Sequence, residues 1–426
     1  MKKLIKNRLI GNIVSLLILQ GSNYIFPLIT FPYLVRTLGA SNYGVLLLCI
    51  AIMQFLNIFI DYGFNISGTR EISINKYKRE KVNEIYNLIM TVKLILTLIV
   101  GVFYFFAILI FSTILENEIA FLLSFFIIIG NTLFPIWLYQ GMEQMKYITY
   151  INIFVKCTVT VLIFLFIQDN NDTNLAVLFQ TFYYLIPGII SLFVVKRKFN
   201  ISFKVIYDKN QILNELVKGK YIFMTNLWIN FYSQGPIIIL GFLSGNAATG
   251  NFGVGQKIMG AFYGLSQPVV QAIYPYMCEL YKNKREMFNN FKRKFLFLSS
   301  ILSLIISIFL YFAAPFLAKI VVGVEDDDIS NLIKFFSIIV YLSIMNTIMA
   351  RIMYAMNLQK YLNKSYSIAA FIFVIFAIPL TIFMNGSGMA IAVISAEATI
   401  FTLNIVNLNP AKISIMESEL EVIEKK

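Results

Sequence analysis

Ionisable side chains within long apolar stretches are the first candidates for chemistry in this 426-residue sequence. A charge in such a stretch is costly to bury in hydrocarbon, so it usually faces a hydrated cavity or pairs with another polar group. Most of these charges are cations, which favours an anionic ligand such as a phosphate, because arginine binds phosphate bidentately and lysine acts as a point charge. The cations are Arg36, Lys93, Lys156, Lys257 and Arg351, and the acids are Asp61 and Glu397.

Amide side chains recur at helical spacing within the same apolar stretches. Gln54, Asn57 and Asp61 stand at i, i+3 and i+7, so they share one face of a helix. We expect several such faces to line a central hydrated cavity. The alternative for any single amide is a hydrogen bond between helices, worth about 1 kcal/mol or less. The candidate cavity amides are Gln54, Asn57, Asn226, Asn230, Gln256, Gln267 and Gln271.

The cations differ in how directly they indicate a ligand. Lys257 lies one residue from the amide stripe that begins at Gln256, which makes it the main candidate for binding a phosphate. Lys93 and Lys156 lie toward one end of their apolar stretches, where a long side chain can instead extend to the polar interface. An alternative role for Arg351 is to fix the orientation of its helix in the membrane.

The two acids are candidates for binding a coupling ion or a proton. The sequence has no histidine, so carboxylates such as Asp61 and Glu397 would have to carry that function. The alternative is that they pair with the cations. The three cysteines, Cys49, Cys157 and Cys278, are far apart and lack metal-ligand spacing. Without a Walker loop, a Rossmann fingerprint or a catalytic triad, we expect no metal, no cofactor and no enzymatic activity.

These residues are distributed over an apolar chain that predicts an all-α integral membrane protein. The composition is 58% hydrophobic and 13% charged, with a mean hydropathy of +0.75, whereas soluble domains carry about 25% charged residues. A spanning helix needs about 20 mostly apolar residues. Twelve such stretches are expected near Leu9–Val35, Val45–Ser67, Ile85–Phe111, Ile119–Tyr139, Ile148–Ile167, Leu175–Val195, Tyr221–Leu243, Gly250–Tyr274, Phe295–Ala318, Leu332–Met356, Ser365–Met384 and Met389–Leu408.

The connections between these stretches alternate in charge. Basic connections alternate with acidic or uncharged ones along the whole chain, and only Arg36 and Lys319 break the pattern. Because basic connections stay in the cytoplasm, both termini are predicted to be cytoplasmic. The net charge of +13 is therefore spread over loops next to anionic lipid headgroups. This distribution argues against nucleic acid as a partner.

An internal repeat relates the two halves of the sequence. Pro27 matches Pro236, and Asn42–Val45 resembles Asn251–Val254, with the same offset of 209 positions. Parallel repeats of this kind predict two bundles of equal orientation, here a six-helix lobe over 1–210 and a second over 211–426 with a short cytoplasmic tail. The alternative is chance matching of short apolar strings.

Three segments resemble the Wzx-type polysaccharide flippases. They are Pro27–Gly44 (PLITFPYLVRTLGASNYG), Asp61–Ser73 (DYGFNISGTREIS) and Tyr139–Tyr147 (YQGMEQMKY). These O-antigen or repeat-unit translocases belong to the superfamily of the MATE multidrug exporters and the lipid II flippases. The resemblance implies two six-helix lobes around a central cavity. It also implies ion-coupled movement of an undecaprenyl-pyrophosphate-linked oligosaccharide from the cytoplasmic to the outer leaflet by alternating access.

The expected location is therefore a bacterial inner or plasma membrane, with the lipid-linked oligosaccharide, the bilayer and other polysaccharide assembly proteins as partners. One alternative is an ion-coupled exporter of small cationic drugs on the same fold, but that function predicts an acidic cavity, and cations are in excess here. A membrane-bound glycan polymerase or ligase is a further alternative. The short outer connections and the missing catalytic clusters argue against it.

Overall fold

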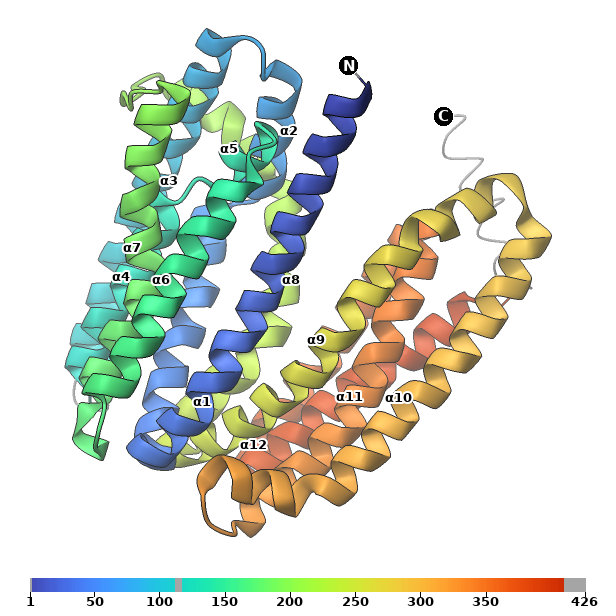
Figure 1. Ribbon diagram of the computed structural model, residues 1–426. Helices are drawn as coiled ribbons and strands as arrows, with labels where there is room; N and C mark the ends of the chain where they lie inside the picture. The colour runs from blue at the N-terminus through green and yellow to red at the C-terminus, as the bar shows by residue number, and fades with distance from the viewer. Residues whose placement is uncertain (1, 112–116, 410–426) are drawn as a thin grey trace. The chain divides into compact units, whose positions relative to one another are not determined.

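Helices form nearly all of the regular structure of this chain (Figure 1). The computed structural model describes residues 2–111 and 117–409, and within these ranges it contains helices and no strands. The predicted all-α class is therefore confirmed. The elements are α1 (Lys2–Asp61), α2 (Phe64–Asn75), α3 (Arg79–Phe111), α4 (Glu118–Leu133), α5 (Ile136–Gly141), α6 (Met145–Phe166), η1 (Asn170–Asp172), α7 (Thr173–Val194), η2 (Val195–Phe199), α8 (Lys209–Leu243), α9 (Gly245–Asn283), α10 (Arg285–Val322), α11 (Asp327–Ala355) and α12 (Gln359–Asn407).

Within the described residues, eight helices are long and apolar enough to cross a membrane. Two of them each contain a pair of predicted spans, since α1 continues past a break at Gly39 and α12 past a break at Asn385. α8 and α9 cover the seventh and eighth predicted spans but are not among the eight. The count of twelve spans and the cytoplasmic position of both termini therefore stay predictions.

A glycine with positive φ precedes the repeated motif in each half of the sequence. Gly39 has a φ of 74° ahead of Asn42–Val45, and Gly245 has a φ of 79° ahead of Asn251–Val254. A Cβ atom would meet nothing within 4 Å at either glycine, so packing does not exclude larger residues. The backbone conformation excludes them, because side chains other than glycine rarely adopt it. Both copies of the motif thus follow a bend that glycine accommodates.

The fourth predicted span, Ile119–Tyr139, is not one continuous helix. α4 ends at Leu133 and α5 begins at Ile136, with Phe134 extended between them at φ −100° and ψ 93°. Proline disfavours the helical conformation for the residue before it, so Pro135 ends α4. The short α5 then places Trp137 and Tyr139 in the core, where neither side chain is exposed.

The chain divides into two compact units, Met1–Ile238 and Ile239–Lys426, here called unit 1 and unit 2. Most of α8 groups with unit 1, whereas the sequence predicts a boundary between residues 210 and 211. The division into two six-helix lobes stays a prediction. Within unit 1, α4 lies so close to α7 that a Cβ on Gly130 would be 2.3 Å from the carbonyl carbon of Tyr184. A larger residue at position 130 would separate the two helices.

The first part of α8 is fixed to the junction of α1 and α2. Phe223 stacks on Tyr62 with ring centroids 4.5 Å apart. The ammonium of Lys218 lies 2.9 Å from a carboxylate oxygen of Glu71 in α2 and 2.9 Å from one of Glu215. The hydrogen bond to Glu71, with a further contribution from Glu215, raises the pKa of Lys218. These contacts hold α8 in unit 1 and thereby position its polar residues against α1.

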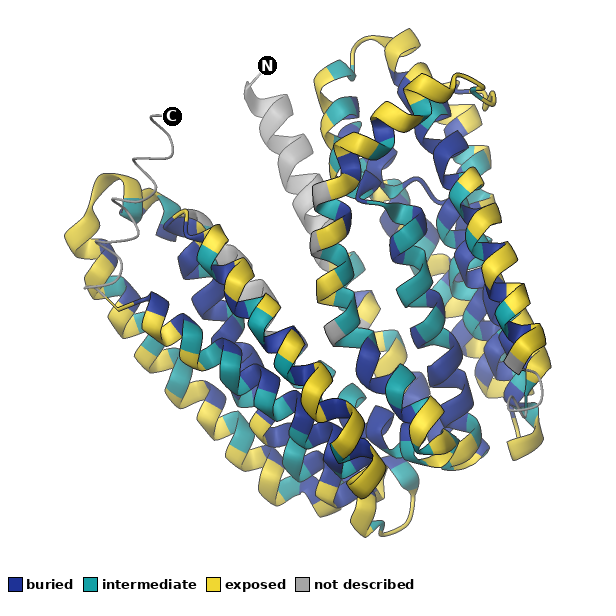
Figure 2. Ribbon diagram, turned by 180° about the vertical axis from the view of Figure 1, so that it is seen from behind, coloured by how far each residue is buried: buried dark blue, intermediate teal, exposed yellow. Residues whose placement is uncertain are grey.

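In unit 2, α11 is the central helix and α10 the most exposed. The most apolar window of α11 is 67% buried, compared with 28% for α12 and 11% for α10. Figure 2 shows the exposed residues of α10 along its outer side. The sequence predicts a lipid-facing position for the span near Phe295–Ala318, and this exposure agrees with it. Polar residues on α11 are instead enclosed by protein.

Candidate functional site

A cluster of amides joins α1 to α8 within unit 1. The Nε2 atom of Gln234 donates a hydrogen bond to Oε1 of Gln54 over 2.7 Å. Asn230 lies one helical turn earlier on α8, and its Nδ2 atom donates to the carbonyl oxygen of Asn226 over 2.9 Å. On α1, Oδ1 of Asn57 is buried with no hydrogen-bond partner among the described residues. The structure therefore links Gln54 on α1 to Gln234 on α8, and the sequence reasoning did not select Gln234.

The acid Asp61 and the cation Lys93 form a buried ion pair in the same unit. The Nζ atom of Lys93 lies 3.5 Å from Oδ1 of Asp61 and donates to the carbonyl oxygen of Asn131 over 3.3 Å. Asn65 donates to the other carboxylate oxygen of Asp61 over 2.7 Å. The Lys93 side chain is 3% exposed. It therefore does not extend to the polar interface, which was one of its two predicted positions. Asp61 pairs with a cation, which is the alternative to ion binding that the sequence left open.

The remaining cations of unit 1 lie apart from that pair. The Nζ atom of Lys156 on α6 donates a hydrogen bond to Oδ1 of Asn23 on α1. Lys156 thus contacts an amide on the face that α1 shares with Gln20 and Pro27. Arg36 is exposed, one turn before the bend at Gly39.

Unit 2 contains a second buried polar cluster, around Glu397 on α12. The hydroxyl of Ser343 on α11 donates to Oε1 of Glu397 over 2.6 Å. The Nδ2 atom of Asn346 donates to Oε2 over 2.5 Å and to the backbone carbonyl oxygen of Glu397 over 3.0 Å. All three residues are under 9% exposed, and Oδ1 of Asn346 has no hydrogen-bond partner among the described residues. The cluster therefore presents carboxylate and amide oxygens within the protein interior.

Sequence reasoning selected Glu397 but missed Ser343 and Asn346. They stand at i and i+3 within the tenth predicted span, and the same spacing selected the amides on α1 and α8. Polar residues at that spacing lie on one face of a helix. Reading the tenth predicted span in the same way would have indicated a polar face opposite Glu397.

The other predicted residues of unit 2 lie on α9 and α11. Gln256 and Lys257 are half-buried on α9. The guanidinium of Arg351 lies 6.0 Å from the ring centroids of both Tyr274 and Tyr354, which is the distance of a cation–π contact. The side chains of Gln267 and Gln271 lie outside the described part of the structure. Among the described residues, no group of three or more acidic or cysteine side chains is placed to hold a metal ion.

Comparison with known proteins identifies the family of this chain. The family described as polysaccharide biosynthesis protein matches residues 9–281. A relative from Escherichia coli (strain K12), named "Putative O-antigen transporter", is 32% identical over 398 residues, which cover 92% of this chain and 94% of the relative. This chain belongs to the polysaccharide biosynthesis protein family. The predicted resemblance is confirmed, and the protein is a multi-pass bacterial membrane protein.

The fold of this chain is similar to that of two kinds of solved structure. The lipid II flippase MurJ in an inward closed conformation matches with a TM-score of 0.69 and 14% identity, covering 97% of this chain and 91% of MurJ. An inward-facing multidrug resistance MATE family transporter of the MOP superfamily matches with a TM-score of 0.58 and 13% identity, covering 95% of this chain and 99% of that structure. At these identities the likeness shows the fold alone.

Proposed function

We propose that this protein is a flippase that moves undecaprenyl-pyrophosphate-linked oligosaccharide repeat units from the cytoplasmic to the outer leaflet. The observation that carries the proposal is the near full-length similarity to a protein named as an O-antigen transporter. The family match and the flippase-like fold support it. In this proposal the chain acts as a transporter and not as an enzyme. The substrate-binding residues are exposed to the two sides of the membrane in turn.

The oligosaccharide would be recognised by amides and the pyrophosphate by cations. Gln54, Asn57, Asn226 and Asn230 carry donors and acceptors that suit sugar hydroxyls. Their partial satisfaction supports this role, because the free Oδ1 atom of Asn57 is available to a ligand. The cations proposed for the pyrophosphate are Lys257, Arg36, Lys156 and Arg351. Lys93 is engaged by Asp61, so in our proposal it contributes through that pair.

Glu397 is the proposed site of ion coupling. Ser343 and Asn346 donate to it as uncharged groups, so these two hydrogen bonds do not neutralise the carboxylate. Together with the free Oδ1 atom of Asn346, the carboxylate offers oxygen ligands of the kind that alkali and alkaline-earth cations prefer. A proton on Glu397 is the alternative occupant. The coupling ion is in either case bound within unit 2.

A deletion strain tests the proposed substrate. We expect loss of surface glycan and accumulation of undecaprenyl-pyrophosphate-linked repeat units on the cytoplasmic side. Restoration by the plasmid-borne gene is the control, and Lys257→Glu should fail to restore export because it places an anion beside the proposed phosphate. Unchanged glycan and lipid-linked pools, in a strain without a second flippase, would refute the proposal. Altered drug susceptibility in that strain would instead favour the drug-exporter alternative.

A further inference from the structure

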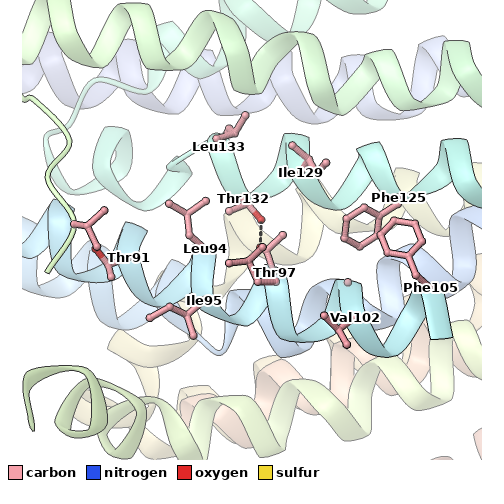
Figure 3. Close-up of a pocket in the computed structure, with 13 residues that line it drawn as sticks. Thr91, Leu94, Ile95, Thr97, Val102, Phe105, Phe125, Ile129, Thr132 and Leu133 are labelled. Carbon is pink, nitrogen blue, oxygen red and sulfur yellow. Dashed lines mark hydrogen bonds between the residues drawn. The ribbon is translucent and has the colours of Figure 1, made fainter. Parts of the chain in front are cut away.

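An apolar groove runs between α3 and α4 on unit 1. Figure 3 shows side chains of both helices facing it. The groove has a volume of about 580 Å³, which is in the range of small-ligand sites. Several of its walls are exposed, including Leu98 at 71% and Val102 at 69%. The main lining residues are Leu94, Leu98, Val102, Phe105, Phe125 and Ile129.

The polar groups next to the groove are already used within the protein. The hydroxyls of Thr97 and Thr132 hydrogen-bond to each other over 2.8 Å, as the dashed line in Figure 3 marks. The hydroxyl of Thr91 accepts a hydrogen bond from the backbone N–H of Ile206 over 3.1 Å. Because these threonines are satisfied, the groove offers a ligand hydrocarbon contact and no free hydrogen-bonding group. A hydrocarbon chain is the ligand that such a wall accepts.

One end of the groove is apolar and the other is basic. Phe105 and Phe125 pack together at the apolar end with ring centroids 4.9 Å apart. Val205 forms the other end, on a segment held to α3 by the hydrogen bond from the Lys204 N–H to Oδ1 of Asn87 over 3.0 Å. The Lys204 side chain is exposed beside Val205, in the basic stretch of the chain that also contains Lys196, Arg197, Lys198 and Lys209.

We propose that this groove binds an acyl chain of an anionic membrane phospholipid, whose phosphate headgroup lies against Lys204. Charge complementarity supports the headgroup, since basic segments at the membrane surface attract anionic lipids. Length supports the chain, since α3 from Thr91 to Phe105 rises about 21 Å at about 1.5 Å per residue. One leaflet of hydrocarbon is about 15 Å thick. A single acyl chain is thus accommodated along the groove, whereas a long polyprenyl chain would extend beyond Phe105.

Photolabelling tests this site without relying on export, so its failure would leave the proposed function standing. The purified full-length protein is placed in phosphatidylcholine vesicles that contain phosphatidylglycerol with a diazirine near the end of one acyl chain. We expect saturable labelling of peptides from α3 and α4. A phosphatidylcholine probe with the same chain should label these peptides much less, and Lys204→Gln should remove that difference. Lys360→Gln, an exposed site on unit 2, should preserve it.

A matched pair of variants separates the groove from the general lipid-facing surface. Val102→Trp fills the groove, whereas Phe103→Trp changes a neighbour that is 71% exposed and does not line it. We expect Val102→Trp to lose the labelling and Phe103→Trp to retain it. Leu98→Trp provides a second groove-filling variant, and elution as a monodisperse peak confirms that each variant is folded. Equal labelling of Val102→Trp and Phe103→Trp, or of the two probes, would overturn the proposal, as would stronger displacement by undecaprenyl phosphate than by phosphatidylglycerol.

Discussion

Each of the two compact units contains one of the two acids predicted to bind an ion, and the units stabilise these acids in different ways. In unit 1, Asp61 lies 3.5 Å from the ammonium of Lys93, and the lysine is almost fully buried. In unit 2, the described side-chain donors to Glu397 are the hydroxyl of Ser343 and the amide of Asn346. One carboxylate is neutralised by a fixed cation of the protein, whereas these hydrogen bonds leave the charge of the other in place.

This difference indicates a structural role for Asp61 and an ion-exchanging role for Glu397. Binding a proton or cation at Asp61 would require the buried Lys93 to lose its partner, and an unpaired buried charge is costly. Glu397 can exchange its occupant while keeping both partners. A bound cation leaves the carboxylate as acceptor, and a protonated Oε1 can instead donate to the Ser343 hydroxyl while Oε2 still accepts from Asn346. The comparison therefore favours Glu397 over Asp61 as the proposed site of ion coupling.

Removing the cation of unit 1 is expected to have the largest effect. Lys93→Met leaves the Asp61 charge without its partner, so the free energy of unfolding should fall by about 3–5 kcal/mol. Denaturation in detergent, followed by circular dichroism, measures this loss. Lys198→Met removes an exposed lysine and should change stability by less than about 0.5 kcal/mol.

A double variant decides whether the loss comes from the pair. Adding Asp61→Asn to Lys93→Met removes both charges, and most of the lost stability should return because replacing a whole buried pair is often neutral. If the double variant stays as unstable as Lys93→Met, then Asp61 is not the group that Lys93 neutralises. Recovery of export with recovery of stability would support the structural role assigned to unit 1.

The hydroxyl of Ser343 is expected to contribute the next largest effect. Ser343→Ala removes a hydrogen bond to a carboxylate, which is worth about 1.5–3 kcal/mol. Ser337→Ala is a matched control on the same helix, because Ser337 is equally enclosed but donates to the Lys334 carbonyl oxygen. Export is measured at a series of proton and sodium gradients. Its dependence on the ion should change for Ser343→Ala and not for Ser337→Ala. If both variants show the same ion dependence, Ser343 has no role in ion coupling.

Glu397→Gln is expected to abolish ion-driven export at little cost in stability. The variant exchanges charge-assisted bonds for neutral ones of about 1 kcal/mol each, and it also removes a buried charge. Export in energised membranes tests the function, and detergent denaturation tests the fold. Glu279→Gln, an exposed acid on α9, should export normally. A Glu397→Gln protein that still responds to the ion gradient would move coupling away from unit 2.

The sequence predicts the helices better than it predicts their ends and partners. The length of each apolar stretch indicates a spanning helix, but the break before Pro135 and the continuation of α1 past Gly39 depend on single backbone conformations. Phe223 on α8, for example, stacks on Tyr62 at the end of the first two spans. Such a contact joins distant parts of the chain, and no periodicity within one helix reveals it.

The candidate site was predicted in its residue types but not in its pairings. Helical spacing selected Gln54, Asn57 and Asp61 as one face, and α1 does bring this face to the amides of α8 through Gln234. Which cation neutralises Asp61 was not predictable, because Lys93 belongs to another helix. Substitution of an amide can test whether these side chains contact a ligand or only other residues of the protein.

Asn230 allows that question to be answered with the smallest disturbance. Asn230→Leu removes only a hydrogen bond to the carbonyl oxygen one turn earlier, over 2.9 Å, and Asn152→Leu removes the same type of bond over 2.8 Å on α6. Both side chains are half-buried, so both variants should change stability by about 0.6 kcal/mol or less. Export should fall only for Asn230→Leu if its face meets the oligosaccharide. Equal export by the two variants would reduce the amides of unit 1 to contacts between helices and leave sugar recognition to other residues.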